Sequence, residues 1–170
     1  MVVKIKKTAL QPRLVLVGSI LYFLVAFTKN DAYAAVALTD CLNDLDTEGE
    51  TYILQNNILQ DCTVTANNVI IDGQSLYSID DEVIATKFGV TINDLTGLTR
   101  VYANTSEYGG TGGPITIDNS TITTVESTGG YSYGYAGGLG GTIIITDSNI
   151  GTVTSDGGGS DTADGGAGGA

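Results

Sequence analysis

The amino-acid sequence predicts an all-β fold in which short parallel strands stack coil upon coil as a solenoid. The first observation is a near-copy: Gly112–Gly130 reads GGPITIDNSTITTVESTGG, and Gly140–Gly158 reads GGTIIITDSNIGTVTSDGG. Eleven of the 19 aligned positions are identical. A fixed period of about 20 to 50 residues is typical of proteins built from stacked repeats.

The second observation is that apolar residues alternate with polar ones inside each copy, as they do in Ile115-Thr116-Ile117. Alternation with a period of two places one set of side chains on one face of a strand. The predicted core sets of the two copies are Ile115, Ile117, Ile122 and Val125, and Ile143, Ile145, Ile150 and Val153. Four aliphatic side chains cannot offset the ordering of one repeat, so each coil must stack on its neighbour, strand upon strand.

The Gly-rich spacers belong to the repeat, because their glycine pairs recur at matching positions. Gly137-Gly138 corresponds to Gly165-Gly166, at the same offset that separates the two near-copies. Glycine tolerates close backbone approach, so we expect the spacers to form the third side of each coil or a loop extruded from it. A disordered linker is the alternative. Tyr131, Tyr133 and Tyr135 alternate in the first spacer, which favours a role in covering neighbouring coils over an exposed aromatic patch.

The segment 1–34 has the composition of a secretory signal helix. A basic start is followed by the apolar stretch Leu14–Phe27 and by a polar step that ends in Ala32-Tyr33-Ala34. This order predicts cleavage between Ala34 and Ala35, with cleavage after Ala37 as the second choice. The apolar stretch is short for a membrane span, which needs about 20 residues. An uncleaved anchor is therefore the less favoured alternative, and the chain is expected to meet a membrane only before cleavage.

Removal of the signal peptide would leave a strongly acidic chain. The whole sequence has a net charge of −12, whereas residues 35–170 keep two basic residues, Lys87 and Arg100, against 18 acidic ones, a net charge of −16. Such a surface repels nucleic acid and anionic lipid, so neither is an expected partner. It is compatible with plain solubility, weak cation binding or a cationic partner.

Cys41 and Cys62 are the two cysteines of the chain. An even number of cysteines in an exported protein predicts a disulfide. That bond would close the loop formed by residues 42–61. Two free thiols are the alternative.

These observations divide the chain into four segments: a signal peptide (1–34), an N-terminal cap of the solenoid (35–65), first irregular coils (66–111) and Gly-rich 28-residue repeats (112–170). A cap is expected because the open end of a solenoid exposes apolar residues and unpaired strand edges. The glycine pair Gly168-Gly169 begins a third copy, which predicts an incomplete array.

The segment before the repeats carries a second pattern, which combines a TYIL strand, a cysteine and an NVIIDG strand. Its residues are Gly49, Thr51–Leu54, Cys62, Asn68–Gly73, Tyr77 and, in a later coil, Gly89–Gly97. This pattern resembles the N-terminal start of right-handed parallel β-helix proteins, the pectate-lyase-like superfamily. The Gly-rich repeats resemble arrays in bacterial surface proteins. The resemblance implies a right-handed parallel β-helix, but that superfamily contains enzymes, adhesins and structural fibres alike.

The resemblance also says which catalytic residues to look for. Lyases of the superfamily hold Ca²⁺ on clustered Asp residues beside an Arg or Lys base, and its hydrolases use an Asp cluster. The candidates here are Asp80, Asp81, Glu82, Asp94, Asp118 and Asp147, with Lys87 and Arg100 as the available bases. Asp118 and Asp147 differ by one position in the repeat, and we identify no catalytic set. Gly157–Gly166 has the composition of calcium-binding nonapeptides without their period, so Ca²⁺ is a minor alternative and no cofactor is expected.

The sequence therefore predicts an exported, non-enzymatic β-solenoid. It would serve as a cell-surface structural or adhesin-like protein that presents a repetitive acidic surface to a glycan or to another cell surface. The alternative is an N-terminal fragment of a polysaccharide lyase or glycoside hydrolase of the β-helix type, with its catalytic coils further along.

Overall fold

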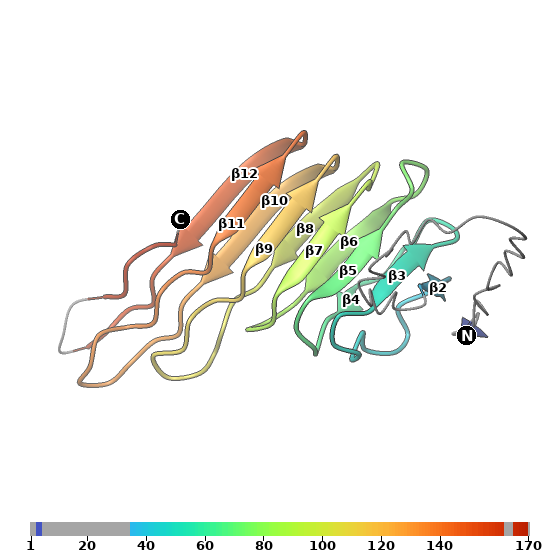
Figure 1. Cartoon of the computed structure of the whole chain (residues 1–170). Coiled ribbons are helices and arrows are strands. Elements are labelled where there is room, and N and C mark those ends of the chain that lie inside the picture. Colours follow the sequence, from blue (N-terminus) through green and yellow to red (C-terminus); the bar gives the residue numbers. More distant parts are fainter. Residues whose placement is uncertain (1–2, 5–34, 162–164, 170) are drawn as a thin grey trace, which may run out of the picture.

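The computed structural model describes residues 3–4, 35–161 and 165–169, and within them every regular element is a strand. Of the predicted signal segment 1–34, only Val3–Lys4 are described, as a short strand; the rest of it, Ala34 included, lies outside the described residues, and Ala35 is the first residue of the described body. Two sheets of parallel strands face each other, and from residue 51 onward each coil contributes one strand to each sheet (Figure 1). The prediction of an all-β parallel solenoid is confirmed.

The first sheet contains, in spatial order, β1 (Val3–Lys4), β2 (Val36–Leu38), β3 (Thr51–Leu54), β5 (Val69–Asp72), β7 (Val90–Asn93), β9 (Ile115–Asp118) and β11 (Ile143–Thr146). The second sheet contains β4 (Cys62–Thr63), β6 (Ile79–Ile84), β8 (Leu98–Tyr102), β10 (Thr121–Thr128) and β12 (Asn149–Asp156). All pairings are parallel except that of β1 with β2. Segment 35–65, predicted as a cap, thus contributes strands to both sheets.

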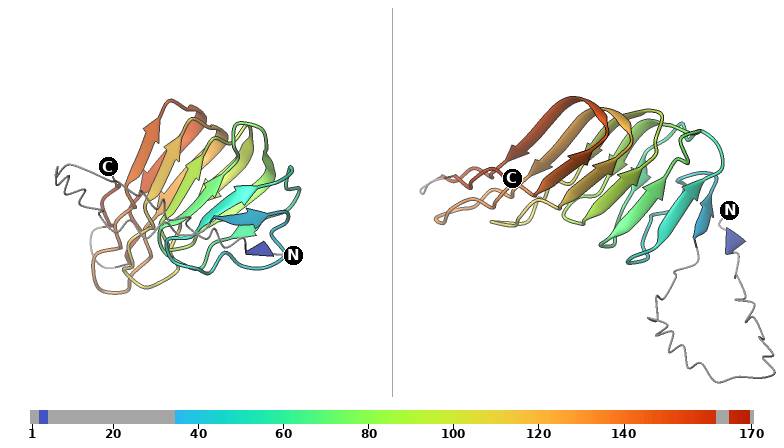
Figure 2. Two further views of the ribbon diagram at one scale, coloured as in Figure 1. Left: turned by 45° about the vertical axis from the view of Figure 1, so that its right-hand side comes forward. Right: turned by 45° about the horizontal axis from the view of Figure 1, so that its top comes forward.

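The coils lengthen along the chain, as the paired residues of the first sheet show. Tyr52 pairs with Ile71, Val90 pairs with Ile115, and Ile115 pairs with Ile143, each pair further apart in sequence than the one before. The turn from the first sheet to the second shortens from 55–61 after β3 to 119–120 after β9, whereas the return connection grows from 64–68 after β4 to 129–142 after β10. The first Gly-rich spacer is the longest of these returns, at 129–142. We call the segments that follow β8 (103–114), β10 (129–142) and β12 (157–161 and 165–169) the Gly-rich extensions, and they project together from one side of the solenoid (Figure 2).

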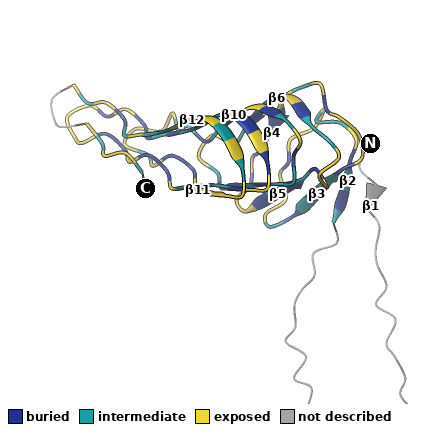
Figure 3. Ribbon diagram, turned by 90° about the horizontal axis from the view of Figure 1, so that it is seen from above, coloured by how far each residue is buried: buried dark blue, intermediate teal, exposed yellow. Residues whose placement is uncertain are grey.

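The core lies between the two sheets and is one cluster of buried, mainly aliphatic side chains contributed by successive coils. Figure 3 marks the buried positions of the chain in dark blue. Ile115, Ile117, Ile122 and Val125 of the first copy are at most 1% exposed. Their counterparts in the second copy lie in register above them but are not enclosed: Ile143 and Ile150 are half-buried, and Ile145 and Val153 are 38% and 48% exposed. These side chains remain exposed because β11 and β12 are the last strands of their sheets, and no described strand pairs with their outer edges.

A ladder of backbone hydrogen bonds holds the Gly-rich extensions together. Each extension has an outgoing leg, which leaves the second sheet, and a returning leg, and the ladder links these legs within one extension and between successive ones. Each N–H donates to a glycine carbonyl one step nearer the N-terminal coils, in the order Gly166 to Gly158, Gly158 to Gly138, Gly138 to Gly130 and Gly130 to Gly110. A Cβ at Gly138 would lie far closer to the Gly110 carbonyl oxygen than the 3.0 Å that real Cβ atoms respect. These legs therefore pack backbone against backbone, which only glycine permits.

A ladder of two serines, Ser127 buried and Ser155 half-buried, ties the second sheet to the Gly-rich extensions. The Ser127 hydroxyl donates to the Gly113 carbonyl (2.8 Å) and accepts from the Gly141 N–H (3.0 Å). Ser155 repeats the pattern one coil later, donating to the Gly141 carbonyl and accepting from the Gly169 N–H, both at 2.8 Å. This arrangement explains why serine and glycine recur at these positions in both copies.

Replacing Ser127 by alanine is expected to lower the free energy of unfolding by about 1–3 kcal/mol, because the carbonyl of Gly113 and the N–H of Gly141, both buried residues, would lose the hydroxyl that they share. Urea unfolding followed by far-UV circular dichroism measures this loss. Thr123→Ala, at an exposed position of the same strand, is the control and should cost clearly less. Equal losses in the two variants would contradict a role for the serine ladder in stability.

Candidate functional site

The candidate catalytic acids are distributed over different elements. Asp80, Asp81 and Glu82 lie on β6, Asp118 ends β9, and Asp94 and Asp147 lie in turns with positive φ of 52° and 45°. Asp94 accepts hydrogen bonds from the Ser75 hydroxyl (3.0 Å) and from the Asn119 side chain. Its carboxylate therefore ties three successive turns together. Asp118 pairs with Thr146, so the one-position offset between Asp118 and Asp147 agrees with the observed stacking register.

Both candidate bases are engaged in ion pairs between coils. Lys87 pairs with Glu107, and its ammonium lies 5.8 Å from the centroid of the Phe88 ring. Arg100 on β8 pairs with Glu126 on β10 (2.6 Å) and lies 3.6 Å from Glu82 on β6.

The Arg100 network lies across three neighbouring strands of the second sheet. The guanidinium carbon is 4.6 Å from the centroid of the Tyr102 ring, and the Asn104 side chain donates to Glu126 (2.6 Å). Burial alone would raise the pKa of Glu126, but the hydrogen bonds from Arg100 and Asn104 outweigh it and lower that pKa. The hydrogen bond to Glu126 likewise raises the pKa of Arg100, so its guanidinium stays charged and serves to hold the coils together.

Replacing Glu126 by glutamine is expected to lower stability at pH 7 by about 1 kcal/mol, since the half-buried Arg100 loses its charged partner. A carboxylate whose folded-state pKa is lowered stabilises the protein above its unfolded-state pKa, and this contribution is lost as pH falls through the folded-state pKa. The difference between wild type and Glu126→Gln should therefore shrink on acidification from pH 7 to pH 3. Denaturant unfolding at both pH values measures it, and a constant difference would contradict the assignment.

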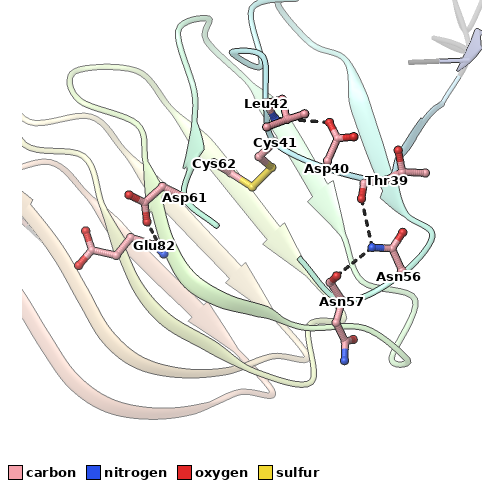
Figure 4. The surroundings of a disulfide bond; sticks show 9 residues. All are labelled: Thr39, Asp40, Cys41, Leu42, Asn56, Asn57, Asp61, Cys62 and Glu82. Atoms are coloured by element: carbon pink, nitrogen blue, oxygen red, sulfur yellow. Dashed lines mark hydrogen bonds between the residues drawn. A yellow bond between two sulfur atoms is a disulfide. The ribbon is translucent and has the colours of Figure 1, made fainter. Parts of the chain in front are cut away.

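The disulfide between Cys41 and Cys62 is confirmed, with Cα atoms 5.0 Å apart (Figure 4). It joins the segment that follows β2 to the start of β4, and Cys62 is fully buried. Beside it, the Asn56 side chain donates to the Thr39 carbonyl at 3.1 Å. The first coil is thus held covalently against the second.

A carboxyl pair lies near this disulfide. The Glu82 N–H donates to the Asp61 carboxylate at 3.1 Å (Figure 4), and Asp61 also interacts with Asp81 on the neighbouring coil. Desolvation, followed by the charge of Asp61, raises the pKa of Asp81. Over the described ranges, no group of three or more Asp, Glu or Cys side chains is arranged to hold a metal ion.

The most exposed aromatic cluster lies on the Gly-rich extensions. We call it the tyrosine groove, a hollow of about 590 Å³ lined by Tyr108, Gly109, Ser132, Tyr133, Tyr135 and Ala136, with Tyr131 adjoining Tyr133. Tyr133 stands between its neighbours, 5.2 Å from Tyr131 in an edge-to-face contact and 6.0 Å from Tyr108, as measured between ring centroids.

Successive coils position this groove through backbone hydrogen bonds. The Gly109 N–H donates to the Tyr131 carbonyl, and the Ser132 N–H donates to the Gly159 carbonyl, both at 3.0 Å. The Ser160 hydroxyl donates to the Tyr135 carbonyl at 2.7 Å. The backbone beneath the tyrosines is therefore fixed from both sides.

The tyrosines are not part of the repeated framework. Residues Gly159 and Asp161 occupy the places of Tyr131 and Tyr133 in the next copy. A Cβ at Gly159 would meet the Tyr131 ring at 3.3 Å, so the missing side chain makes room for that ring. A hydrogen bond to the Asp161 carboxylate raises the pKa of Tyr131 to about 12.

The sequence favoured a covering role for Tyr131, Tyr133 and Tyr135, but these three rings are 40–78% exposed. The signal that could have identified the groove is the break in the repeat, where one copy has tyrosine and the other has glycine or aspartate. No helix in the described part of the chain is long and apolar enough to cross a membrane. No protein family model, curated protein or solved structure matches the chain.

Proposed function

We propose that the chain is an exported, non-enzymatic β-solenoid of right-handed, pectate-lyase-like architecture, acting as a structural or adhesin-like protein at a bacterial-type cell surface. The observation that carries this proposal is the register of the last coils, in which Ile115 lies on Ile143 and Val125 on Val153. Coils stacked in register form a stiff body, and its extensions project side by side. Such a body is suited to presenting surface groups at fixed spacings.

Two further features support the proposal. A disulfide is typical of proteins that fold in an oxidising, extracytoplasmic compartment. The charged residues considered for catalysis also have structural partners, since Arg100, Lys87 and Asp94 connect neighbouring coils. Their side chains therefore contribute to stacking.

Export is tested by expressing the full sequence in a bacterial host and analysing the fractions by mass spectrometry. We expect an extracytoplasmic product that begins at Ala35. Ala34→Pro should abolish cleavage between Ala34 and Ala35, because a signal peptidase needs a small residue at that place, and any remaining processing should occur after Ala37. A soluble cytoplasmic product that retains Met1 would contradict export.

The enzymatic alternative is tested separately on the purified protein. Incubation with polygalacturonate and with mixed neutral glycans, with and without Ca²⁺, should yield neither new reducing ends nor unsaturated products. Turnover of any of these polymers would overturn the non-enzymatic proposal and support a lyase or hydrolase.

A further inference from the structure

The tyrosine groove exposes more aromatic surface than a purely structural role requires. Tyr108 and Tyr135 are 75% and 78% exposed, and Tyr133 is 63% exposed. Exposed rings forgo the free energy that burial would supply, about 25 cal/mol per Å². The next coil has Gly159 and Asp161 at the aligned positions, so the stacking of coils does not need the rings. Their concentration in one hollow points to a ligand.

The groove is also held rigid before any ligand arrives. Ser132 is 6% exposed, and its backbone forms an isolated parallel β-bridge with Ser160 in the next coil. The glycine ladder fixes the two legs of the extension on which the tyrosines stand. A site built on fixed backbone loses little conformational entropy on binding, which favours affinity.

The lining combines flat apolar faces with polar groups at the rim. Tyrosine supplies a ring face and, at its tip, a hydroxyl that donates and accepts hydrogen bonds. A pyranose ring has the complementary chemistry, because its axial C–H groups form an apolar face while its hydroxyls point outward. The hollow has a volume of about 590 Å³, within the usual size of small-molecule sites, and it is shallow and widely open to solvent.

The charge of the molecule narrows the class of ligand. Residues 35–170 carry a net charge of −16, and Asp161 lies beside Tyr131, so uronic-acid polymers and other anions are repelled. A cage for a quaternary ammonium would present ring faces around one point. Here Tyr131 and Tyr133 meet edge to face, with planes at 81°, so that the edge of one ring covers part of the face of the other.

We propose that the tyrosine groove binds a neutral glycan, with pyranose C–H faces stacked on the exposed rings of Tyr108, Tyr133 and Tyr135. This inference rests on the proposed surface-contact function and names its site and its ligand class. Tyr133 contributes most, because it is central and lies between Tyr108 and Tyr131.

Titration calorimetry on the purified, processed protein tests the proposal. The probes are cellotetraose, mannotetraose and tetra-N-acetylchitotetraose, compared with tetragalacturonate and choline. We expect binding of at least one neutral oligosaccharide and no binding of the last two. Tyr133→Ala should weaken the affinity at least about tenfold, as loss of a central aromatic does at binding sites. Tyr133→Phe keeps the ring and should lose less.

Leu76→Ala serves as the matched control, since Leu76 is 69% exposed in the turn between β5 and β6 and should leave the affinity unchanged. Tyr135→Ala is the second groove variant, and its highly exposed side chain can be removed without disturbing the coils. Thermal unfolding is compared for every variant.

The proposal is overturned if no neutral oligosaccharide binds, if Tyr133→Ala and Tyr135→Ala bind as wild type does, or if choline or tetragalacturonate binds at the groove instead. These outcomes leave intact an exported, non-enzymatic product, which the processing and turnover experiments establish on their own. Failure of the glycan site is therefore distinguishable from failure of the proposed function.

Discussion

Replacing Gly138 by alanine is expected to destabilise the protein by about 3–5 kcal/mol, because the added methyl group would enter a backbone-to-backbone contact of the extensions. The new Cβ would overlap the Gly110 carbonyl oxygen. Moving the backbone to relieve that overlap would break two hydrogen bonds at this residue, from Gly138 to the Gly130 carbonyl and from Gly158 to the Gly138 carbonyl (both 2.8 Å). The three atoms nearest to the new Cβ all belong to the backbone of Gly109 and Gly110, so no flexible side chain can move aside.

Gly97→Ala is the matched control for this experiment. A Cβ at Gly97 would meet only the Ser78 Cβ at 3.6 Å, an ordinary van der Waals contact. Urea unfolding gives the global effect, and amide hydrogen exchange at Gly158 reports the extension itself. We expect faster exchange in Gly138→Ala and wild-type exchange in Gly97→Ala. Similar behaviour of the two variants would show that the extension is not packed backbone to backbone.

Removing the disulfide is expected to cost about 3 kcal/mol. Its partners are 21 residues apart, and closure of a loop of this length restricts the unfolded chain by about that amount. The double variant Cys41→Ala/Cys62→Ala is preferred to serine because Cys62 is fully buried, and a hydroxyl there would need a hydrogen-bond partner. Urea unfolding with and without reductant measures the loss.

Reductant should destabilise the wild type and leave the double alanine variant unchanged. Asn56→Ala, which removes the hydrogen bond to the Thr39 carbonyl near the disulfide, should cost no more than about 1.5 kcal/mol. If reductant has no effect on the wild type, the bond does not contribute to holding the first coil.

Much of the fold follows from local features that can be read along the chain. Ile115 and Ile143 occupy the same position in the two copies of the repeat, and they are paired in the structure, so the repeat length predicted which residues stack. Alternation in Ile115-Thr116-Ile117 indicated the inward side of β9, because successive side chains of a strand point to opposite faces. The cysteine pairing was also predictable, since a chain with two cysteines allows only one intramolecular bond.

Other features depend on where coils meet and could not be read along the chain. Burial of the second apolar set is one of them, because Val153 has the pattern of a core residue but lies at the outermost coil, where it is 48% exposed. The partners of Arg100 are another. Glu82 and Glu126 lie on the two strands next to that of Arg100. Their distances from Arg100 along the chain are unequal, so the repeat pattern does not predict either ion pair.

The sequence by itself determined the coil, the alternation of its strands and the need for glycine, because these are properties of one repeat. Only the tertiary structure decided that Tyr108 would lie beside Tyr133. Their offset along the chain equals that between the paired residues Val90 and Ile115, whereas the offset from Ile115 to Ile143 is longer. A side chain meets its neighbour across coils according to the length of each return connection, and those lengths differ from coil to coil.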